Sequence, residues 1–392
     1  MIKIEHNDLE KISENYSEII KAIFLNKIDI IKCIVLILKK DDIAEKKTVN
    51  KKVDEFTSAL KVVIGRDELL KSKHPKGKGK KTSDLIYTIN YYKIKSDKRS
   101  KCRKTKKYDD LINKVDLIKK FINSYDLFGS EPEKLIILNE KLKNTIGTIN
   151  KKLYDYFFNY KNFYNEINNN LGKTIDLKCC PYCNRNYITY IPDEGKRIVG
   201  PTYDHFFSKS RYVYLTLSFY NLIPSCYVCN SNLKLNIDFN LKTHLHPYCD
   251  GFGNDVFFDF ELSTNDYLGK KTICFNPYLD YNKKITSKKQ KQIFGIDTDK
   301  DTGNLKVFKL QEIYKSHGDS VEEIYKKFDK SSPFYIGSIS KLISKLKTSE
   351  EEFYRFYFRN YYNIIDFNKR PLAKLDRDIY NKLKLISEFN HK

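Results

Sequence analysis

The sequence predicts an α+β protein in which a cysteine-rich region of short strands and loops lies between two mainly helical regions. Three observations support this. Isoleucine and leucine recur at helical spacing in the first and last parts of the 392-residue chain. Cysteine, proline and glycine gather instead in residues 173–250, where apolar runs are short. Hydrophobic residues make up 41% of the chain, enough to bury a core, which argues against intrinsic disorder.

Residues 1–172 form the first helical region. Glycine and proline are scarce there outside one basic stretch, which favours long helices. We expect helices over about Tyr108–Tyr125 and Glu133–Asn170. The residues with helical spacing are Ile12, Ile19, Ile20 and Ile23, and then Leu135, Leu138, Leu142 and Ile146.

The positive charge is concentrated within this first region. The chain has 72 Lys and Arg against 50 Asp and Glu, a net charge of +22, and most of the cations are lysine. Codon bias can produce a lysine excess, but it does not explain why residues 71–107 hold 15 cations and two anions. We expect an arm that contacts nucleic acid, with Lys98, Arg99 and Arg103 among its binding residues. A solvated loop is the alternative.

Residues 251–392 form the second flanking region, which begins irregularly and then returns to helical periodicity. A hairpin is expected around Ile296–Phe308, followed by helices through Leu310–Phe328 and Ser340–Leu385. The acidic segment 297–303 resembles a calcium loop, but its glycine is one place late and Phe308 stands where glutamate is needed. We therefore expect a polar turn there, and a partner-docking role for the helices.

Two Cys-x-x-Cys pairs stand out among the nine cysteines. Each such turn presents two thiolates to one metal ion, and two turns complete a closed tetrahedral zinc site. The expected structural zinc ligands are Cys180, Cys183, Cys226 and Cys229. Because 42 residues separate the pairs, a whole substructure is looped out between them. Four reduced core cysteines are one alternative. A redox pair is another, but neither motif has a βαβ context.

A cytoplasmic protein with no membrane partner is expected. The longest apolar run, Ile28–Leu38, is too short to span a bilayer and is interrupted by Asp29 and Lys32. The first residues are polar and lack the apolar segment of a secretory signal.

The segment of about residues 178–240 resembles the zinc-stabilised HNH endonucleases, which carry a ββα-metal finger. The resemblance rests on the order and spacing of two metal motifs and several polar residues. These are Cys180-x-x-Cys183, Asp204-His205, Asn221-Leu222, Cys226-x-x-Cys229-Asn230 and Lys234. It implies an HNH ββα-metal core at residues 173–250 and metal-dependent hydrolysis of nucleic-acid phosphodiester bonds, with DNA the favoured substrate.

The resemblance also implies a role for each residue. His205 would be the general base, with a pKa near neutrality that suits proton transfer from water. Asp204 and Asn230 would bind a catalytic Mg²⁺ or Mn²⁺ ion through oxygen atoms. Asn221 would orient the loop and the histidine without touching the ion.

The remaining positions concern phosphate binding and an alternative ligand. Lys234 is four residues after Asn230, so it would share a helix face with it and meet the same phosphate. Lys209 and Arg211 are further candidates for binding nucleic acid. Since Asn230 stands where the simplest motif has histidine, His244 or His246 is the next candidate ligand if Asn230 does not bind the ion.

The flanks resemble the HNH nuclease component of Septu-type bacterial anti-phage defence systems, which works beside an ABC/AAA-type ATPase. The short sequence segments that resemble this component lie at residues 208–212, 217–221, 246–253 and 369–375. The chain has no Walker motif, so such an ATPase would be a separate protein. Two alternatives stay open: a nuclease directed at RNA or tRNA, and a non-catalytic zinc-containing module that binds nucleic acid.

Overall fold

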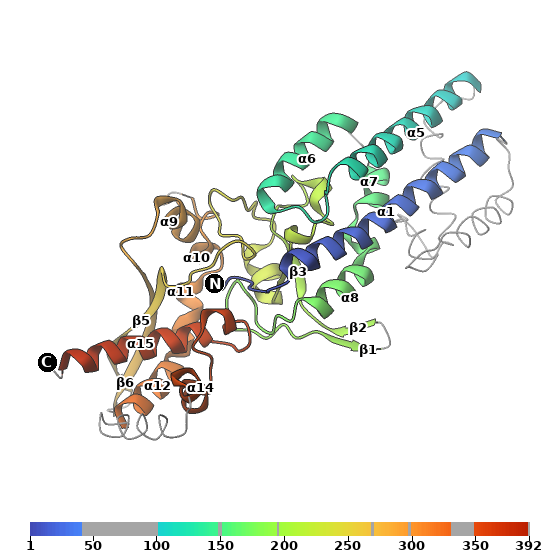
Figure 1. Ribbon diagram of the computed structural model, residues 1–392. Coiled ribbons are helices and arrows are strands. Elements are labelled where there is room, and N and C mark those ends of the chain that lie inside the picture. The colour runs from blue at the N-terminus through green and yellow to red at the C-terminus, as the bar shows by residue number, and fades with distance from the viewer. Residues whose placement is uncertain are drawn as a thin grey trace.

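The computed structural model describes residues 1–40, 101–147, 151–193, 196–267, 270–296, 299–330 and 349–390. Helices dominate both ends of the chain and small antiparallel sheets lie in the middle (Figure 1), which confirms the α+β class. Lys98 and Arg99 lie outside the described residues, and Arg103 lies in the first turn of a helix. The predicted nucleic-acid arm at residues 71–107 therefore stays a prediction.

The N-terminal helices pack lengthwise. Helix α1 (Leu9–Lys40) runs beside α5 (Lys101–Ser124), and α6 (Pro132–Ile146) packs on α5 (Figure 1). Apolar residues three or four apart on facing sides are fully buried, which explains why these sequences form amphipathic helices. They include Ile20, Phe24, Ile28 and Ile31 on α1, and Val115, Ile118 and Ile122 on α5.

The predicted helix over Glu133–Asn170 is wrong as a single element. Helix α6 ends at Ile146, and Gly147 follows with a positive φ of 63°, which glycine adopts without strain. The chain continues as α7 (Lys151–Phe157), the short helix η1 (Tyr160–Asn162) and α8 (Tyr164–Thr174).

The cysteine-rich region forms a strand–strand–helix unit. Strands β1 (Ile191–Asp193) and β2 (Lys196–Val199) pair first. Then β3 (Thr202–His205) pairs antiparallel with β4 (Leu222–Ser225), and His205 lies opposite Leu222. The seven-residue π-helix η4 (Val228–Lys234) follows β4 directly. The long loop from β3 to β4 contains η2 (Val213–Leu215) and η3 (Phe219–Asn221).

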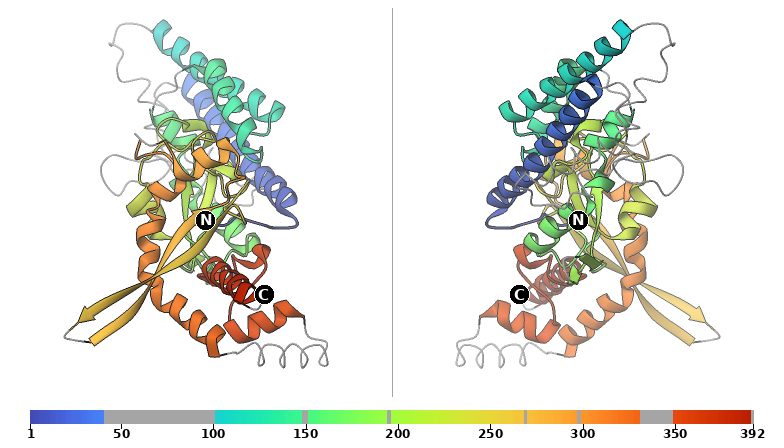
Figure 2. Two further views of the ribbon diagram at one scale, coloured as in Figure 1. Left: turned by 90° about the vertical axis from the view of Figure 1, so that its left-hand side faces the viewer. Right: turned by 90° about the vertical axis from the view of Figure 1, so that its right-hand side faces the viewer.

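The C-terminal region contains a long hairpin that the sequence analysis did not predict. Strands β5 (Val256–Tyr267) and β6 (Lys270–Tyr281) pair over their whole length, and the hairpin projects from the body (Figure 2). The predicted hairpin at Ile296–Phe308 is wrong, because α10 (Asn304–Val307) lies inside it. The Asn304 side chain bonds the backbone of Leu245, which fixes the start of this helix. Asp297 and Thr298 of the expected polar turn lie outside the described residues.

The remaining helices confirm most of the C-terminal prediction. They are α9 (Ser287–Phe294), α11 (Leu310–Tyr314), η5 (Lys315–His317), α12 (Gly318–Lys330), α14 (Glu350–Phe358), η6 (Ile364–Asp366) and α15 (Ala373–Asn390). The expected continuous helix to Leu385 is interrupted after α14, where Arg359 takes a left-handed φ of 59°. Residues 340–348 of that prediction lie outside the described part.

All three regions contribute to one hydrophobic core. A contiguous cluster of buried apolar side chains extends in sequence from Met1 to Leu383. Among the helices that the structure describes, none is both long and apolar enough to cross a membrane. The β3–β4–η4 unit is thus held by packing from both flanking regions.

Candidate metal centre and active site

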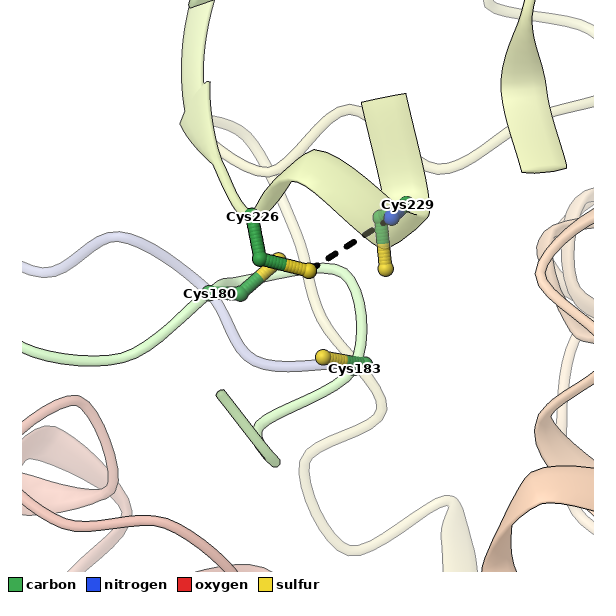
Figure 3. Close-up of side chains that lie close together, drawn as sticks. All are labelled: Cys180, Cys183, Cys226 and Cys229. Carbon is green, nitrogen blue, oxygen red and sulfur yellow. Dashed lines mark hydrogen bonds between the residues drawn. The ribbon is translucent and has the colours of Figure 1, made fainter. Parts of the chain in front are cut away.

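The four predicted zinc ligands come together in a buried cluster. Cys180 and Cys183 lie on the turn after α8, while Cys226 and Cys229 lie at the junction of β4 and η4 (Figure 3). All four sulfur atoms lie within 4.8 Å of one another. Tetrahedral Zn²⁺ with Zn–S bonds of about 2.3 Å needs sulfurs roughly 3.8 Å apart. The donor set and its spacing therefore fit a structural zinc ion.

Hydrogen bonds to sulfur support a thiolate cluster. The backbone N–H of Cys229 and the side-chain amide of Asn186 donate to Cys226 Sγ at 3.4 and 3.3 Å. The backbone N–H of Arg185 donates to Cys183 Sγ at 3.4 Å. Contact among the four sulfurs lowers the pKa of the Cys226 and Cys183 thiols, whereas burial and the same contacts raise the pKa of Cys180 and Cys229 in the absence of a metal ion. Such donors stabilise the charged sulfur that metal binding requires.

The first cysteine turn is anchored to distant parts of the chain. Asn184 follows Cys183 in a left-handed conformation with φ of 51°, and its side chain donates to the Phe367 carbonyl at 2.8 Å. The Tyr314 hydroxyl donates to the Cys183 carbonyl at 2.6 Å. The backbone N–H of Ile2 donates to the Pro181 carbonyl at 2.8 Å. The cluster therefore joins the N-terminal segment, α11 and the turn before α15.

Asp204, the predicted ligand of the catalytic ion, is buried and fully engaged. The Tyr182 hydroxyl donates to its Oδ2 at 2.7 Å, and Lys234 Nζ donates to its Oδ1 at 2.9 Å. The side chains of Lys234 and Asp204 are only 2% and 3% exposed. Lys234 Nζ also donates to the His205 carbonyl at 2.7 Å. Lys234 thus points inward in this structure, and its predicted contact with a phosphate stays a prediction.

This arrangement does not fit a Mg²⁺ or Mn²⁺ ion at Asp204 as it stands. These ions prefer carboxylate oxygens with room left for water and phosphate. Both Asp204 oxygens already accept hydrogen bonds, and a buried ammonium occupies the place next to one of them. Asn230, the second predicted ligand, is half-buried in the first half of η4.

His205 lies at the end of β3, and the ring of Tyr160 covers its imidazole. Its Nε2 lies 2.9 Å from the Thr216 carbonyl, so this nitrogen carries the proton and Nδ1 keeps the lone pair. Tyr160 packs edge-on against the imidazole, with ring centroids 5.3 Å apart. Burial, with the nearby charge of Lys209, lowers the pKa of His205 to about 3. The ring is therefore neutral at pH 7, although the sequence suggested a pKa near neutrality.

Asn221 fixes the loop that follows His205. Its side-chain oxygen accepts from the Phe207 N–H at 2.7 Å, and its amide donates to the carbonyls of Leu215 at 2.9 Å and Phe207 at 3.3 Å. The side chain is completely buried. Asn221 is thus placed to orient the loop, as the resemblance implies.

The other predicted phosphate-binding residues lie on the loop after β3. The Lys209 residue as a whole is exposed, but its ammonium group is partly buried, and this burial lowers its pKa. The negative charge of Asp204 acts in the opposite direction and raises the pKa. Arg211 is exposed and bonds Asp238 at 2.6 Å, so its guanidinium is already paired. Lys209 is therefore the predicted cation best placed to meet a phosphate near His205.

His244 and His246, the alternative ligands, are both buried. His244 stacks on Phe239 at 3.8 Å and its Nε2 bonds the Asp301 carbonyl at 3.1 Å, which is a packing role. His246 packs against Phe206, with ring centroids 4.2 Å apart, and neither nitrogen makes a hydrogen bond of good geometry within the described residues. Neither joins the four-cysteine cluster.

Three contacts of the site were missed from the sequence. Tyr182 bonds Asp204, Thr216 bonds His205, and Tyr160 covers the imidazole. Only Tyr182 carried a signal, because it lies inside the first Cys-x-x-Cys motif. The other two are distant in sequence from the residues that they contact.

Comparison of the chain with protein-family models found no match, and comparisons with curated proteins and with solved structures found none either.

Proposed function

We propose that the chain is an HNH-type endonuclease that hydrolyses phosphodiester bonds of nucleic acid. The observation that carries this proposal is the β3–β4–η4 unit, in which Asp204 and His205 end the first strand. The four-cysteine cluster lies at the junction of β4 and η4. This arrangement is compatible with a ββα-metal finger, the finer fold that the sequence resemblance implies.

His205 is the general base of this proposal. In hydrolysis, a water oxygen attacks phosphorus, its proton passes to a base, and the ester oxygen leaves. The Thr216 carbonyl fixes the proton on Nε2, which leaves Nδ1 as the nitrogen that accepts the proton. The positive charge of Lys209 would be offset by a bound phosphate, which would raise the pKa of His205 and make it a stronger base.

Dependence on Mg²⁺ or Mn²⁺ belongs to the proposal under one condition. Lys234 must leave Asp204, because the ammonium now occupies that carboxylate. A divalent ion bound there would supply charge neutralisation at the phosphate.

The substrate and the biological setting are further parts of the proposal. DNA is the favoured substrate, and an ABC/AAA-type ATPase encoded separately is the proposed partner in anti-phage defence. The HNH resemblance of residues 178–240 supports DNA as the substrate, and the short sequence segments in the flanks support the ATPase partner and the defence role. An RNA- or tRNA-directed nuclease remains the alternative within the same chemistry, since nothing at His205 selects for a 2′-hydroxyl.

A second candidate function is a non-catalytic zinc module that binds nucleic acid. A specific observation favours it, namely that Asp204 is closed off by Lys234 and Tyr182. His205 is also only 5% exposed. In that case the polar residues would stabilise the finger and perform no chemistry.

Cleavage assays separate these candidates. Purified wild-type protein and His205→Ala would be incubated with Mg²⁺ or Mn²⁺ and either plasmid DNA or total tRNA, alone and with the candidate ATPase. His6→Ala, a histidine in the N-terminal segment, is the matched control. We expect nicking of DNA by wild type and His6→Ala alone. Equal cleavage by His205→Ala, or none by any protein, would contradict the proposal. Cleavage of tRNA alone would favour the RNA alternative.

A further inference from the structure

A basic groove lies on the C-terminal region, on residues separate from those around His205. It has a volume of about 920 Å³ and opens between the end of α12, helix α14 and the turn before α15. Its lining residues are Lys327, Glu352, Arg355, Phe356, Tyr357, Arg359 and Arg370. Figure 1 shows α12, α14 and α15 at one end of the molecule.

Arginine is concentrated at this groove. Lysine supplies most of the 72 cations in the chain, and arginine is rare, yet three arginines, Arg355, Arg359 and Arg370, line this groove. A codon bias toward lysine does not explain this clustering. The planar guanidinium binds two phosphate oxygens at once, which lysine does not do.

Lys327 lies 4.0 Å from Glu323, but the arginines that line the groove are not paired with carboxylates of the described residues. Within the described residues, none of the guanidiniums of Arg355, Arg359 and Arg370 forms an ion pair. Glu352 is the one acidic residue of the lining, and its carboxylate accepts the Ser349 N–H at the start of α14. The sequence of residues 331–348 contains lysine but no Asp or Glu.

Other arginines of the chain show the contrast. Arg377 bonds Asp378 at 2.8 Å, and Arg211 bonds Asp238 at 2.6 Å. Like charges gathered without a counter-charge repel one another, so the groove favours an anion from solution.

Aromatic rings accompany the cations. Arg355, Lys369 and Arg370 lie 4.8, 5.4 and 5.8 Å from the centre of the Tyr361 ring. These cation–π contacts orient the side chains but do not remove their charge. Phe356 is 83% exposed, which leaves its ring face free to stack. Guanidiniums beside an exposed aromatic ring are the features that bind unpaired bases and their phosphates.

We propose that this groove binds single-stranded nucleic acid. Arg355, Arg359 and Arg370 hold successive phosphates, and a base stacks on Phe356. The proposal goes beyond hydrolysis at His205, because it concerns a binding surface that contains none of the residues near that histidine. An acidic protein lacks the planar bases that Phe356 would stack on, and an anionic membrane would not use this ring as a stacking platform.

Fluorescence anisotropy with a labelled 20-nucleotide oligo(dT) tests this on the full chain, without added divalent ions. Arg355→Gln/Arg359→Gln removes two charges from the groove. Lys283→Gln/Lys284→Gln removes the same charge from exposed lysines between β6 and α9. We expect at least about tenfold weaker binding for the arginine variant, and a salt-dependence slope smaller by about 1.4, the value for two phosphates on a single strand. The lysine variant should stay within about twofold of wild type.

Two further variants test the groove with substitutions that should leave the fold intact, so that a loss of binding is not explained by misfolding. Arg359 has a left-handed φ of 59°, a conformation that glycine adopts without strain, so Arg359→Gly should keep the fold and still weaken binding. Phe356→Ser alters an exposed ring and should weaken oligo(dT) binding at least about fivefold, through lost stacking. It should change binding of a DNA duplex less, because paired bases are not free to stack.

The opposite results would overturn the proposal. These are an equal loss in both charge variants, unchanged binding in all variants, or arginine-dependent binding to phosphatidylserine vesicles without binding to oligo(dT). Since no cleavage is measured, failure here would leave hydrolysis at His205 standing. Failure of hydrolysis would likewise leave this binding site standing.

Discussion

The buried ion pair of Asp204 and Lys234 decides whether the candidate active site can take up a metal ion. Both side chains are almost completely removed from solvent, and each needs the other as its counter-charge. The Tyr182 hydroxyl completes the hydrogen bonds of the carboxylate. A divalent ion bound at Asp204, as proposed, would therefore compete with Lys234 for the same oxygen atom.

Replacing Lys234 tests this competition. Lys234→Met leaves a buried carboxylate without its partner, so we expect the variant to be destabilised by about 3–5 kcal/mol. Added Mn²⁺ would then substitute for the ammonium and raise the melting temperature of the variant more than that of wild type. Thermal unfolding with and without Mn²⁺ measures both effects. An equal response of the two proteins to Mn²⁺ would contradict the competition.

Asn221 allows a separate test of the loop that follows His205. Asn221→Ala removes three hydrogen bonds and leaves the buried Phe207 N–H without a partner, which should cost at least about 2 kcal/mol. Urea unfolding measures this loss. Asn276→Ala, whose amide bonds Ser263 on the exposed hairpin, is the control and should change stability by less than about 0.5 kcal/mol. Equal stability of the two variants would show that Asn221 does not hold the loop.

For single residues, the sequence predicted which residues form the candidate site better than it predicted the contacts that those residues make. The four cysteines follow from their own spacing. The hydrogen bonds of Asn221 hold the loop after His205, and its role in orienting the histidine stays a prediction. The inward turn of Lys234 was not predicted, because charged side chains are rarely buried unless paired. The depressed pKa of His205 could not be derived either, since burial and the position of Lys209 depend on the folded chain.

Helix α15 contains a carboxyl group whose charge should affect stability with pH. Burial raises the pKa of Asp376 from 3.8 to about 7, although the Asn360 amide donates to it at 2.6 Å. The folded chain therefore binds a proton more tightly than the unfolded chain. The resulting stabilisation is complete below about pH 3.8, declines as pH rises and is lost above about pH 7.

Asp376→Asn removes this titration while keeping the shape of the side chain. Between pH 5 and 8 the free energy of unfolding of wild type should fall relative to that of Asp376→Asn, by at most about 2.7 kcal/mol, and by less than this because the group keeps some solvent contact. Urea unfolding at several pH values measures the difference. A constant difference across this range would show that Asp376 does not titrate there.

At the scale of elements, long stretches of apolar periodicity predicted the presence of helices well. The residues at which those helices are interrupted were not predicted. The helix expected near Tyr108–Tyr125 exists as α5, whereas one predicted helix ends at Ile146 and another is interrupted at Arg359. The β5–β6 hairpin was missed because its outer half is not anchored in the core. Leu262 and Ile273, for example, are 56% and 61% exposed. Such strands lack the alternation of apolar, buried and polar, exposed residues by which a strand is recognised in a sequence.

At the scale of the whole molecule, the four-cysteine cluster joins segments from both ends of the chain. Its first turn bonds Ile2, Tyr314 and the segment before α15. Cys226→Ser should therefore lose zinc and much of the stability of the core, since binding energy at a structural zinc site is folding energy. Cys274→Ser, on β6 and outside the cluster, is the control. Zinc content per chain and urea unfolding measure the outcome. Full zinc content in Cys226→Ser would contradict the assignment.

In the proposed mechanism, His205 beside the four-cysteine cluster acts as the base in phosphodiester hydrolysis. The rate of plasmid nicking by wild type and His205→Ala, compared at equal zinc content, tests it most directly. A positioned base contributes about 10²- to 10⁴-fold, so we predict a loss of at least about 100-fold in the variant. Equal rates for the two proteins, with zinc retained in both, would contradict the claim.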